Sequence, residues 1–216
     1  MIPSGTSAIG KPSLLNRTDL ISIILRLQHD GWAFARANDP SLKKSRSEPY
    51  MNGRLFLGMT HVRDTLKLTN MYLVEIPGAR SSPNLAVPDR EPDIIMLFME
   101  FGTNEPHAII ECKRVDPLQS SRALRGEYIR SGVDRFTSGS YGAGHDLDFM
   151  VGYLLRGNGA DAVADINSHL ENVGRKLCCL KRSKKFSRYG YVADSTHKRK
   201  IDGSSIKLIH SFLGFE

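Results

Sequence analysis

Two short apolar segments, Ile94–Phe101 and Ala108–Cys112, lie close together in the chain and are separated by the stretch Gly102–Pro106. Apolar runs of this length, bounded by Gly, Asn and Pro, are typical of buried strands that are joined by a turn. The spacing therefore predicts a β-hairpin. Any fold for this chain has to bury that hairpin against further elements.

Segments on either side of the hairpin alternate between helical and strand patterns. Apolar residues at helical spacing predict helices over Asn16–His29, Glu48–Leu66, Leu118–Phe136 and Asp161–Val173. Short apolar runs predict further strands over Met71–Ile76, Phe149–Leu155, Tyr189–Asp194 and Ile206–Phe212. Polar or proline-rich composition predicts loops over Ala37–Ser47 and Pro77–Pro92. This order predicts a mixed α/β fold around one sheet.

The length and charge of the chain narrow its organisation and its partners. The 216 residues fit a single domain, with a core at about 48–155 and a basic C-terminal part at about 156–216. Thirty Lys and Arg against 23 Asp and Glu give a net charge of +7 at pH 7. Such a charge favours polyanionic partners, nucleic acid above all. The alternative is a basic protein without such a partner.

Neither a membrane protein nor a secreted disulfide scaffold is expected. No apolar run approaches the roughly 20 residues of a membrane helix. The segment Met1–Lys11 has no basic and apolar pattern of a secretory signal. The cysteines are Cys112 and the adjacent pair Cys178 and Cys179, an odd number that fits reduced thiols. These features predict a cytoplasmic protein.

The hairpin carries three charged residues that it brings together. Asp93 precedes the first apolar segment, and Glu111 and Lys113 stand at the end of the second. Because side chains alternate between the faces of a strand, Glu111 and Lys113 share one face, about 6–7 Å apart, while Cys112 points into the core. In a hairpin the start of one strand lies beside the end of the other. We therefore expect Asp93 next to Glu111.

This arrangement is suited to binding a metal ion. Two carboxylates and a main-chain carbonyl supply the oxygen ligands that Mg²⁺ and Mn²⁺ prefer. Lys113 is suited to orient an attacking water or to neutralise charge on a phosphate. The alternative is structural, with Glu111 and Lys113 forming exposed ion pairs at the end of a strand.

The pattern Pro92-Asp93 and then Glu111-Cys112-Lys113, with 17 residues between the two acids, resembles the PD-(D/E)xK nuclease superfamily. The resemblance covers about residues 48–155. It implies a restriction-endonuclease-like three-layer domain, with a central mixed β-sheet flanked by helices. It also implies that Asp93 and Glu111 bind Mg²⁺ or Mn²⁺, that the carbonyl of Cys112 completes the site, and that Lys113 is the catalytic lysine.

Members of this superfamily often add a glutamate from the preceding helix. Glu48, at the start of a predicted helix, matches that position, and Glu75 on the preceding strand is its competitor. The resemblance implies a Mg²⁺-dependent endonuclease that hydrolyses phosphodiester bonds in DNA, in restriction or anti-phage defence, as a homodimer or a subunit of a larger complex. Two alternatives are a catalytically silent nucleic-acid-binding module and an RNase on the same fold.

The C-terminal part contains a strongly basic stretch. From Arg175 to Lys200 there are ten Lys and Arg but one acid, and Phe186, Tyr189 and Tyr191 are interleaved. Basic side chains contact phosphates, and aromatic side chains stack on unpaired bases. We expect nucleic-acid contacts from Arg135, Lys181, Arg182, Lys184, Lys185, Arg188, His197 and Arg199. The alternatives are a solvated surface for the stretch and a structural hydrogen bond for Arg135.

Two further residues carry structural expectations. Gly132 interrupts a helical pattern at a cost of about 1 kcal/mol relative to Ala, which predicts close packing or an approaching substrate. His210 lies in the apolar strand predicted over Ile206–Phe212, and we expect it to be a hydrogen-bonded core residue.

Overall fold

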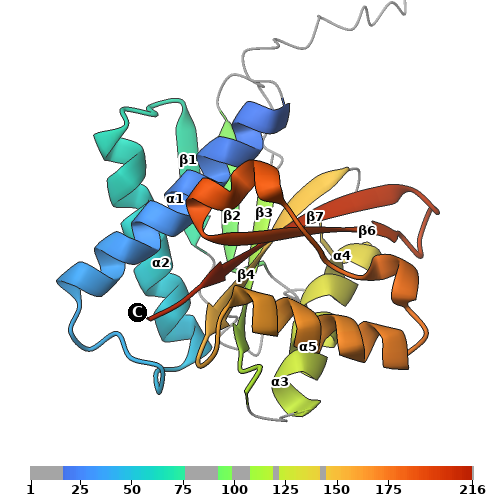
Figure 1. Cartoon of the computed structure of the whole chain (residues 1–216). Coiled ribbons are helices and arrows are strands. Elements are labelled where there is room, and N and C mark those ends of the chain that lie inside the picture. Colours follow the sequence, from blue (N-terminus) through green and yellow to red (C-terminus); the bar gives the residue numbers. More distant parts are fainter. Residues whose placement is uncertain (1–16, 76–91, 99–107, 119–121, 142–144, 216) are drawn as a thin grey trace, which may run out of the picture.

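A seven-stranded sheet with the order β1-β2-β3-β4-β7-β6-β5 runs through the protein, and helices cover both of its faces (Figure 1). The computed structural model describes residues 17–75, 92–98, 108–118, 122–141 and 145–215. The strands are β1 (Met71–Glu75), β2 (Ile94–Phe98), β3 (Ala108–Val115), β4 (Leu147–Leu154), β5 (Lys181–Arg182), β6 (Tyr191–Lys198) and β7 (Ser205–Leu213). β4 pairs parallel with β3 and β7, and the other pairs are antiparallel. The expected mixed sheet and the β2–β3 hairpin pairing are confirmed.

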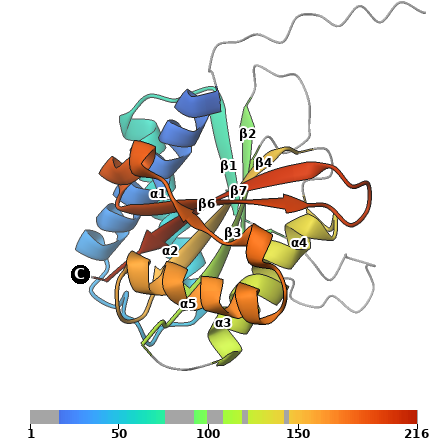
Figure 2. The same cartoon turned by 45° about the vertical axis from the view of Figure 1, so that its right-hand side comes forward.

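The helices form one layer on each face of the sheet (Figure 2). α1 (Arg17–Asn38) and α2 (Glu48–Thr65) cover one face, and α3 (Arg122–Tyr128), α4 (Asp134–Thr137) and α5 (Gly159–Asn172) cover the other. Each layer encloses its own apolar cluster, the first around Trp32 and Met51 and the second around Phe136 and Ile166. Burial of these clusters is the main contribution that holds the three layers together.

The first helix is longer than its sequence pattern predicts. It was predicted to end at His29, two residues before Gly31, yet α1 continues to Asn38. The glycine serves a helix crossing instead, because a Cβ at Gly31 would lie 2.6 Å from the amide nitrogen of Met59 in α2. A Cβ at Gly58 would lie 2.0 Å from the carbonyl oxygen of Gly31. The two glycines let the helix backbones touch.

The strand that carries the acid–lysine motif is also longer than expected. It was predicted to end at Cys112, but β3 continues to Val115 because residues 110–115 pair with β4. Glu111 and Lys113 therefore lie inside the strand and not at its end. Likewise, β6 runs to Lys198, beyond the predicted end at Asp194, because it pairs with β7 along its whole length.

The helix predicted over Leu118–Phe136 is a composite. α3 begins at Arg122, a π-helical turn, η2 (Ile129–Val133), follows it, and α4 completes the segment. The π-turn contains Gly132, where a Cβ would lie 2.6 Å from Cε of Met150 and 3.5 Å from Cγ of Lys113. The close packing expected at Gly132 is confirmed, and its partners are residues of β3 and β4.

Three further expectations concern α5, two predicted loops and the basic stretch. α5 agrees with its prediction within two residues, and Asn158 caps its start by accepting hydrogen bonds from the amides of Ala160 and Asp161. The turn expected over Gly102–Pro106 lies outside the described residues, as does the loop expected over Pro77–Pro92 up to residue 91. The basic stretch contains β5 and two short 3₁₀ helices, η3 (Lys176–Cys178) and η4 (Lys184–Tyr189).

Candidate active site

Two carboxylates replace a neighbouring strand along part of β3. The pairing of β2 with β3 reaches Ile110, and within the described residues no strand continues it on that side. The amide of Cys112 donates to Oδ2 of Asp93 at 2.7 Å, and the amide of Arg114 donates to Oε2 of Glu48 at 3.1 Å. Asp93 stands at the start of β2 and Glu48 at the start of α2, so both elements direct an acid to this edge.

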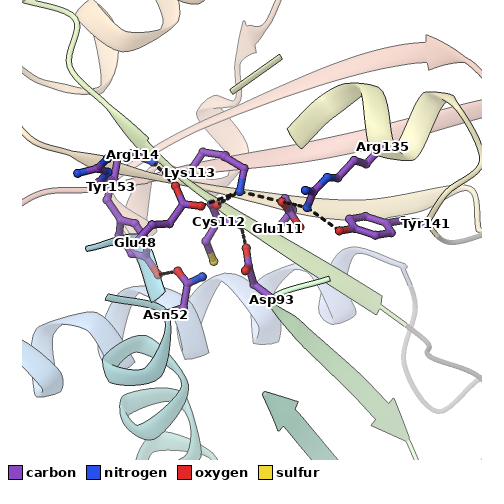
Figure 3. Close-up of polar contacts among 10 residues, drawn as sticks. All are labelled: Glu48, Asn52, Asp93, Glu111, Cys112, Lys113, Arg114, Arg135, Tyr141 and Tyr153. Atoms are coloured by element: carbon purple, nitrogen blue, oxygen red, sulfur yellow. Dashed lines mark hydrogen bonds and ion pairs between the residues drawn. The ribbon is translucent and has the colours of Figure 1, made fainter. Parts of the chain in front are cut away.

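The ammonium group of Lys113 lies at the centre of the cluster (Figure 3). Its Nζ is 2.7 Å from Oε1 of Glu48 and 2.9 Å from Oε1 of Glu111, and it donates to the carbonyl oxygen of Cys112 at 2.8 Å. Burial lowers the pKa of Lys113, but the neighbouring carboxylates outweigh burial and raise it. The lysine is therefore held in its charged form. The alternative of an exposed ion pair at a strand end is wrong, because Lys113 is buried.

Glu111 presents one bonded oxygen and one free oxygen. Its side chain is 0% exposed. Oε1 accepts from Lys113 and from Nη1 of Arg135, the latter at 2.8 Å, and the same Nη1 donates to the hydroxyl of Tyr141 at 2.6 Å. Oε2 is buried and has no hydrogen-bond partner among the described residues. Burial, reinforced by the charge of Asp93, raises the pKa of Glu111 to about 7.

The charges of the cluster do not balance. The carboxylates of Glu48, Asp93 and Glu111 face the two cations Lys113 and Arg135. Burial also raises the pKa of Asp93, although Lys113 opposes this shift. When all three acids are ionised, one negative charge is left over in a site that is mostly shielded from water, where an uncompensated charge is costly, and the raised pKa values of Glu111 and Asp93 reflect this cost.

The oxygen donors fit a hard divalent cation. Within the described ranges no three His, Cys, Asp or Glu side chains converge as a metal cluster. The set on offer here is mixed: the free Oε2 of Glu111, the carboxylate of Asp93 and the main-chain carbonyl of Cys112. Oxygen ligands of this kind suit Mg²⁺ or Mn²⁺. The cation would also compensate the unbalanced charge.

The two candidates for the additional acid lie in different places. Glu48 contacts both Lys113 and the amide of Arg114. Glu75 lies at the end of β1 against α2, where a Cβ at Gly53 would come within 3.2 Å of its Oε1. Burial raises the pKa of Glu75. The fold therefore brings Glu48, and not Glu75, to Lys113.

Cys112 takes part through its backbone only. Its side chain points to the opposite face of β3, into the cluster beneath α1 and α2, as expected. Burial raises the pKa of the thiol well above its ordinary value. On the same side, the hydroxyl of Tyr153 donates to Oδ1 of Asn52 at 3.0 Å and ties β4 to α2 (Figure 3).

The exposed basic residues of the C-terminal part lie away from this site. Lys181 and Arg182 are on β5, and Lys184, Lys185 and Arg188 are in η4. β4, β7 and β6 separate β5 from β3, a distance of roughly 19 Å at about 4.8 Å per strand. These five side chains are exposed, and they remain predicted nucleic-acid contacts.

Two of the three interleaved aromatic residues do not offer faces for base stacking. Phe186 and Tyr189 are buried in the cluster beneath α1 and α2. Lys185 lies over the ring of Phe186, and Arg188 lies over the ring of Tyr189. The expectation of stacking by these two residues is wrong, because the rings close the apolar core beside η4.

Arg199 and His197 differ from the exposed basic residues. Arg199 is 2% exposed, and its guanidinium donates to the carbonyl oxygens of Phe136, Tyr141 and His145. It clamps the segment that follows α4, so the expectation that it contacts nucleic acid is corrected. His197 is also buried, and its Nε2 lies 2.7 Å from Oγ of Ser195.

Arg135 lies at the site itself, and Tyr141 is a component that the sequence analysis missed. Tyr141 follows α4, lies in the second apolar cluster and shares Nη1 of Arg135 with Glu111. The only signal was its place in a Gly-Ser-Tyr segment directly after the helix that carries Arg135.

No family model, curated protein or solved structure gave a significant match to this chain. Among the described residues, no helix has both the length and the apolar character needed to cross a membrane.

Proposed function

We propose that this protein is a metal-dependent nuclease that hydrolyses phosphodiester bonds in DNA. The observation that carries the proposal is the convergence of Glu48, Glu111 and the carbonyl of Cys112 on the ammonium of Lys113, with a free buried oxygen of Glu111 beside them. Together with Asp93, these are the residues to which the resemblance to PD-(D/E)xK nucleases assigns a role. A role in stability alone leaves the free oxygen unexplained.

Each residue has a distinct part in the proposed reaction. Asp93, Oε2 of Glu111 and the carbonyl of Cys112 hold the divalent cation. The chemistry that the cation supplies is polarisation of the phosphate and a lower pKa of water. Glu48 holds Lys113 in position through the contact at 2.7 Å. Lys113 neutralises charge that develops on the phosphate oxygens during attack.

Arg135 and Tyr141 position Glu111 and do not contact the substrate in the proposed reaction. Nη1 of Arg135 fixes Oε1 of Glu111, which directs Oε2 away from both cations. Gly132, three residues before Arg135, packs closely beside this cluster, since a Cβ there would lie 2.6 Å from Cε of Met150 and 3.5 Å from Cγ of Lys113. Both arginine and tyrosine are therefore positioning residues.

The net charge of +7 supports a nucleic-acid substrate. The test is cleavage of supercoiled plasmid, linear duplex, single-stranded DNA and RNA with Mg²⁺, Mn²⁺ or EDTA. We expect cutting of DNA with either metal and none with EDTA. Preferential cutting of RNA would replace DNA as the substrate and keep the site.

The matched variants are Lys113→Met, Glu111→Gln and Lys207→Met. Lys113→Met and Glu111→Gln should abolish cutting, while Lys207→Met, which removes an ion pair between β7 and Asp194 of β6, should retain it. Thermal unfolding of all three proteins shows whether each still folds. Unchanged cutting by folded Lys113→Met would refute the site. If neither wild type nor any variant cuts DNA, but all of them bind DNA in a salt-sensitive way, the result would favour a nucleic-acid-binding module without catalysis.

A further inference from the structure

A hydrogen-bonded chain of four side chains crosses the second apolar layer and reaches a pocket outside the candidate active site. The hydroxyl of Tyr128 lies 2.9 Å from Nδ1 of His210. Nε2 of His210 lies 2.8 Å from Oγ of Ser195, and the same Oγ lies 2.7 Å from Nε2 of His197. Nδ1 of His197 is buried and has no hydrogen-bond partner among the described residues.

The direction of this chain determines what His197 presents. Both histidines are neutral at pH 7, because burial lowers the pKa of His197 to about 4 and that of His210 to about 3. If the hydroxyl of Tyr128 donates to Nδ1 of His210, then Nε2–H of His210 donates to Oγ of Ser195. The hydroxyl of Ser195 in turn donates to Nε2 of His197, so the ring proton of His197 lies on Nδ1. In the opposite direction the hydroxyl proton of Tyr128 would be sealed in the core without an acceptor, at a cost of about 1–3 kcal/mol. Only the first direction places the unpaired donor on His197, a residue that borders a pocket.

The ring of His197 lines a pocket of about 690 Å³ between η3, α4 and the β6–β7 hairpin. Four basic residues line the same pocket: Arg175, Lys176, Lys198 and Lys200. Arg175 is paired with Asp134 through Nη1 at 2.6 Å. Within the described part of the chain, no acid forms an ion pair with the three lysines. The pocket is therefore cationic, and His197, whose Nδ1 is unpaired and buried, is one of its lining residues.

We propose that this pocket binds a phosphate group, with Nδ1–H of His197 and the guanidinium of Arg175 as inner contacts and the three lysines as outer contacts. A phosphate offers several acceptor oxygens and a negative charge, which match one neutral donor and four cations. The phosphate belongs to the nucleic-acid strand that occupies the candidate active site, and this assignment of its source rests on the proposed function.

The pocket lies on the same face of the sheet as the candidate active site. Glu111, Met150, His210 and Ala193 are successive cross-strand partners, and His197 is four residues beyond Ala193. Three strand spacings and four residues correspond to roughly 20 Å between Glu111 and His197. Along the axis of a duplex, at about 3.4 Å per base pair, a separation of this size corresponds to about six base pairs.

One turn of helix connects the two places. In α4, Asp134 pairs with Arg175 at the pocket, and the next residue, Arg135, pairs with Glu111 at the active site. The carbonyl of Thr137 accepts from the amide of Lys200 at 2.7 Å and fixes the hairpin beside α4 (Figure 1). A strand that fills both places therefore runs past α4.

The first arm of the test uses inorganic phosphate and no metal. Long-range ¹H–¹⁵N spectra of the histidine side chains are recorded at pH 7 with phosphate and with NaCl at equal ionic strength. We expect the His197 signals to shift with phosphate only. Lys198→Gln/Lys200→Gln should weaken this response at least tenfold, whereas the control Lys181→Gln/Lys184→Gln, which alters exposed lysines outside the pocket, should not. No shift at His197 would overturn the proposal.

The second arm uses a labelled single-stranded DNA of 20 nucleotides in EDTA, so that cleavage plays no part. Removing two phosphate contacts should reduce the slope of log K against log salt by about 1.4. The Lys198→Gln/Lys200→Gln protein should show this reduction, whereas the Lys113→Met protein, which keeps the pocket, should retain the wild-type contribution of Lys198 and Lys200 when the same two lysines are changed in it. If phosphate shifts the His197 signals but the salt slope of DNA binding is unchanged, the bound phosphate does not come from the nucleic-acid strand. The pocket would then bind free phosphate. If both arms give the expected result but the protein cleaves no DNA, the proposed nuclease activity is refuted and the proposed phosphate pocket is not.

Discussion

The buried histidines make a specific prediction about stability and pH. His210 is fully buried, and burial, with a smaller contribution from His197, lowers its pKa to about 3 from an ordinary 6.5. An unfolded chain takes up a proton at His210 near pH 6.5, whereas the folded protein does not until about pH 3. Because the unfolded state then binds more protons, the free energy of unfolding falls as the pH falls below 6.5.

The magnitude follows from these values. Each pH unit below the unfolded pKa is worth about 1.4 kcal/mol, so lowering the pH from 7 to 5 costs about 2 kcal/mol through His210. Glu111 works in the opposite direction, since its pKa of about 7 lies above its ordinary 4.5 and its protonation stabilises the fold over the same interval. The useful quantity is therefore the difference between wild type and a protein that lacks His210.

Urea unfolding of wild type and His210→Gln at pH 7 and pH 5 measures this difference. We expect wild type to lose about 2 kcal/mol more than His210→Gln between the two pH values, whatever the level of stability of the variant. His61→Gln, a change at an exposed histidine, is the matched control and should follow wild type. Parallel pH dependence of wild type and His210→Gln would refute the buried neutral histidine.

Three other predictions concern the candidate active site. Glu48→Gln should slow DNA cleavage about 100-fold, by the order of magnitude of a lost electrostatic contact, while Glu75→Gln stays within about twofold; initial rates with Mg²⁺ measure both, and equal losses would contradict the assignment. Gly132→Ala should destabilise the fold by about 1–3 kcal/mol in urea, because its Cβ would lie 2.6 Å from Met150; Ser131→Ala is the control, and an unchanged midpoint for Gly132→Ala would show that Met150 yields freely. Mg²⁺ at ten times its Kd should stabilise the native state by about 1.4 kcal/mol and raise Tm by about 2–6 °C; Asp93→Asn should abolish the shift, and a shift that persists there would place the metal elsewhere.

Local patterns predicted much of the fold. The hairpin pairing and the helices α2 and α5 follow from apolar spacing, capping and turns within one segment. The full length of β3 could not be predicted, because Lys113 and Arg114 interrupt its apolar pattern and its partner β4 lies about 40 residues further along the chain. The end of α1 was predicted too early for a similar reason, since the contact that Gly31 makes is with α2 and not within its own helix.

In the candidate site, too, contacts within one hairpin could be predicted and contacts between distant segments could not. Asp93, Glu111 and Lys113 could be grouped because a hairpin relates them by strand alternation alone. The contacts of Arg199 could not be foreseen, because its carbonyl partners precede it by 54 to 63 residues. A run of basic letters does not show which guanidinium reaches solvent and which is enclosed by backbone.

The carboxylates that accept hydrogen bonds from the amides of Cys112 and Arg114 have a consequence for the evolution of this protein. Asp93 and Glu48 complete the edge of β3, so a lineage that abandoned the chemistry would still be selected to keep acceptors at these two positions. Glu111 is different: its buried charge benefits the fold little, and drift would replace it with an apolar residue soon after its use was lost. Among descendants of this protein, the residue at position 111 would therefore distinguish working enzymes from retired ones better than either edge acid.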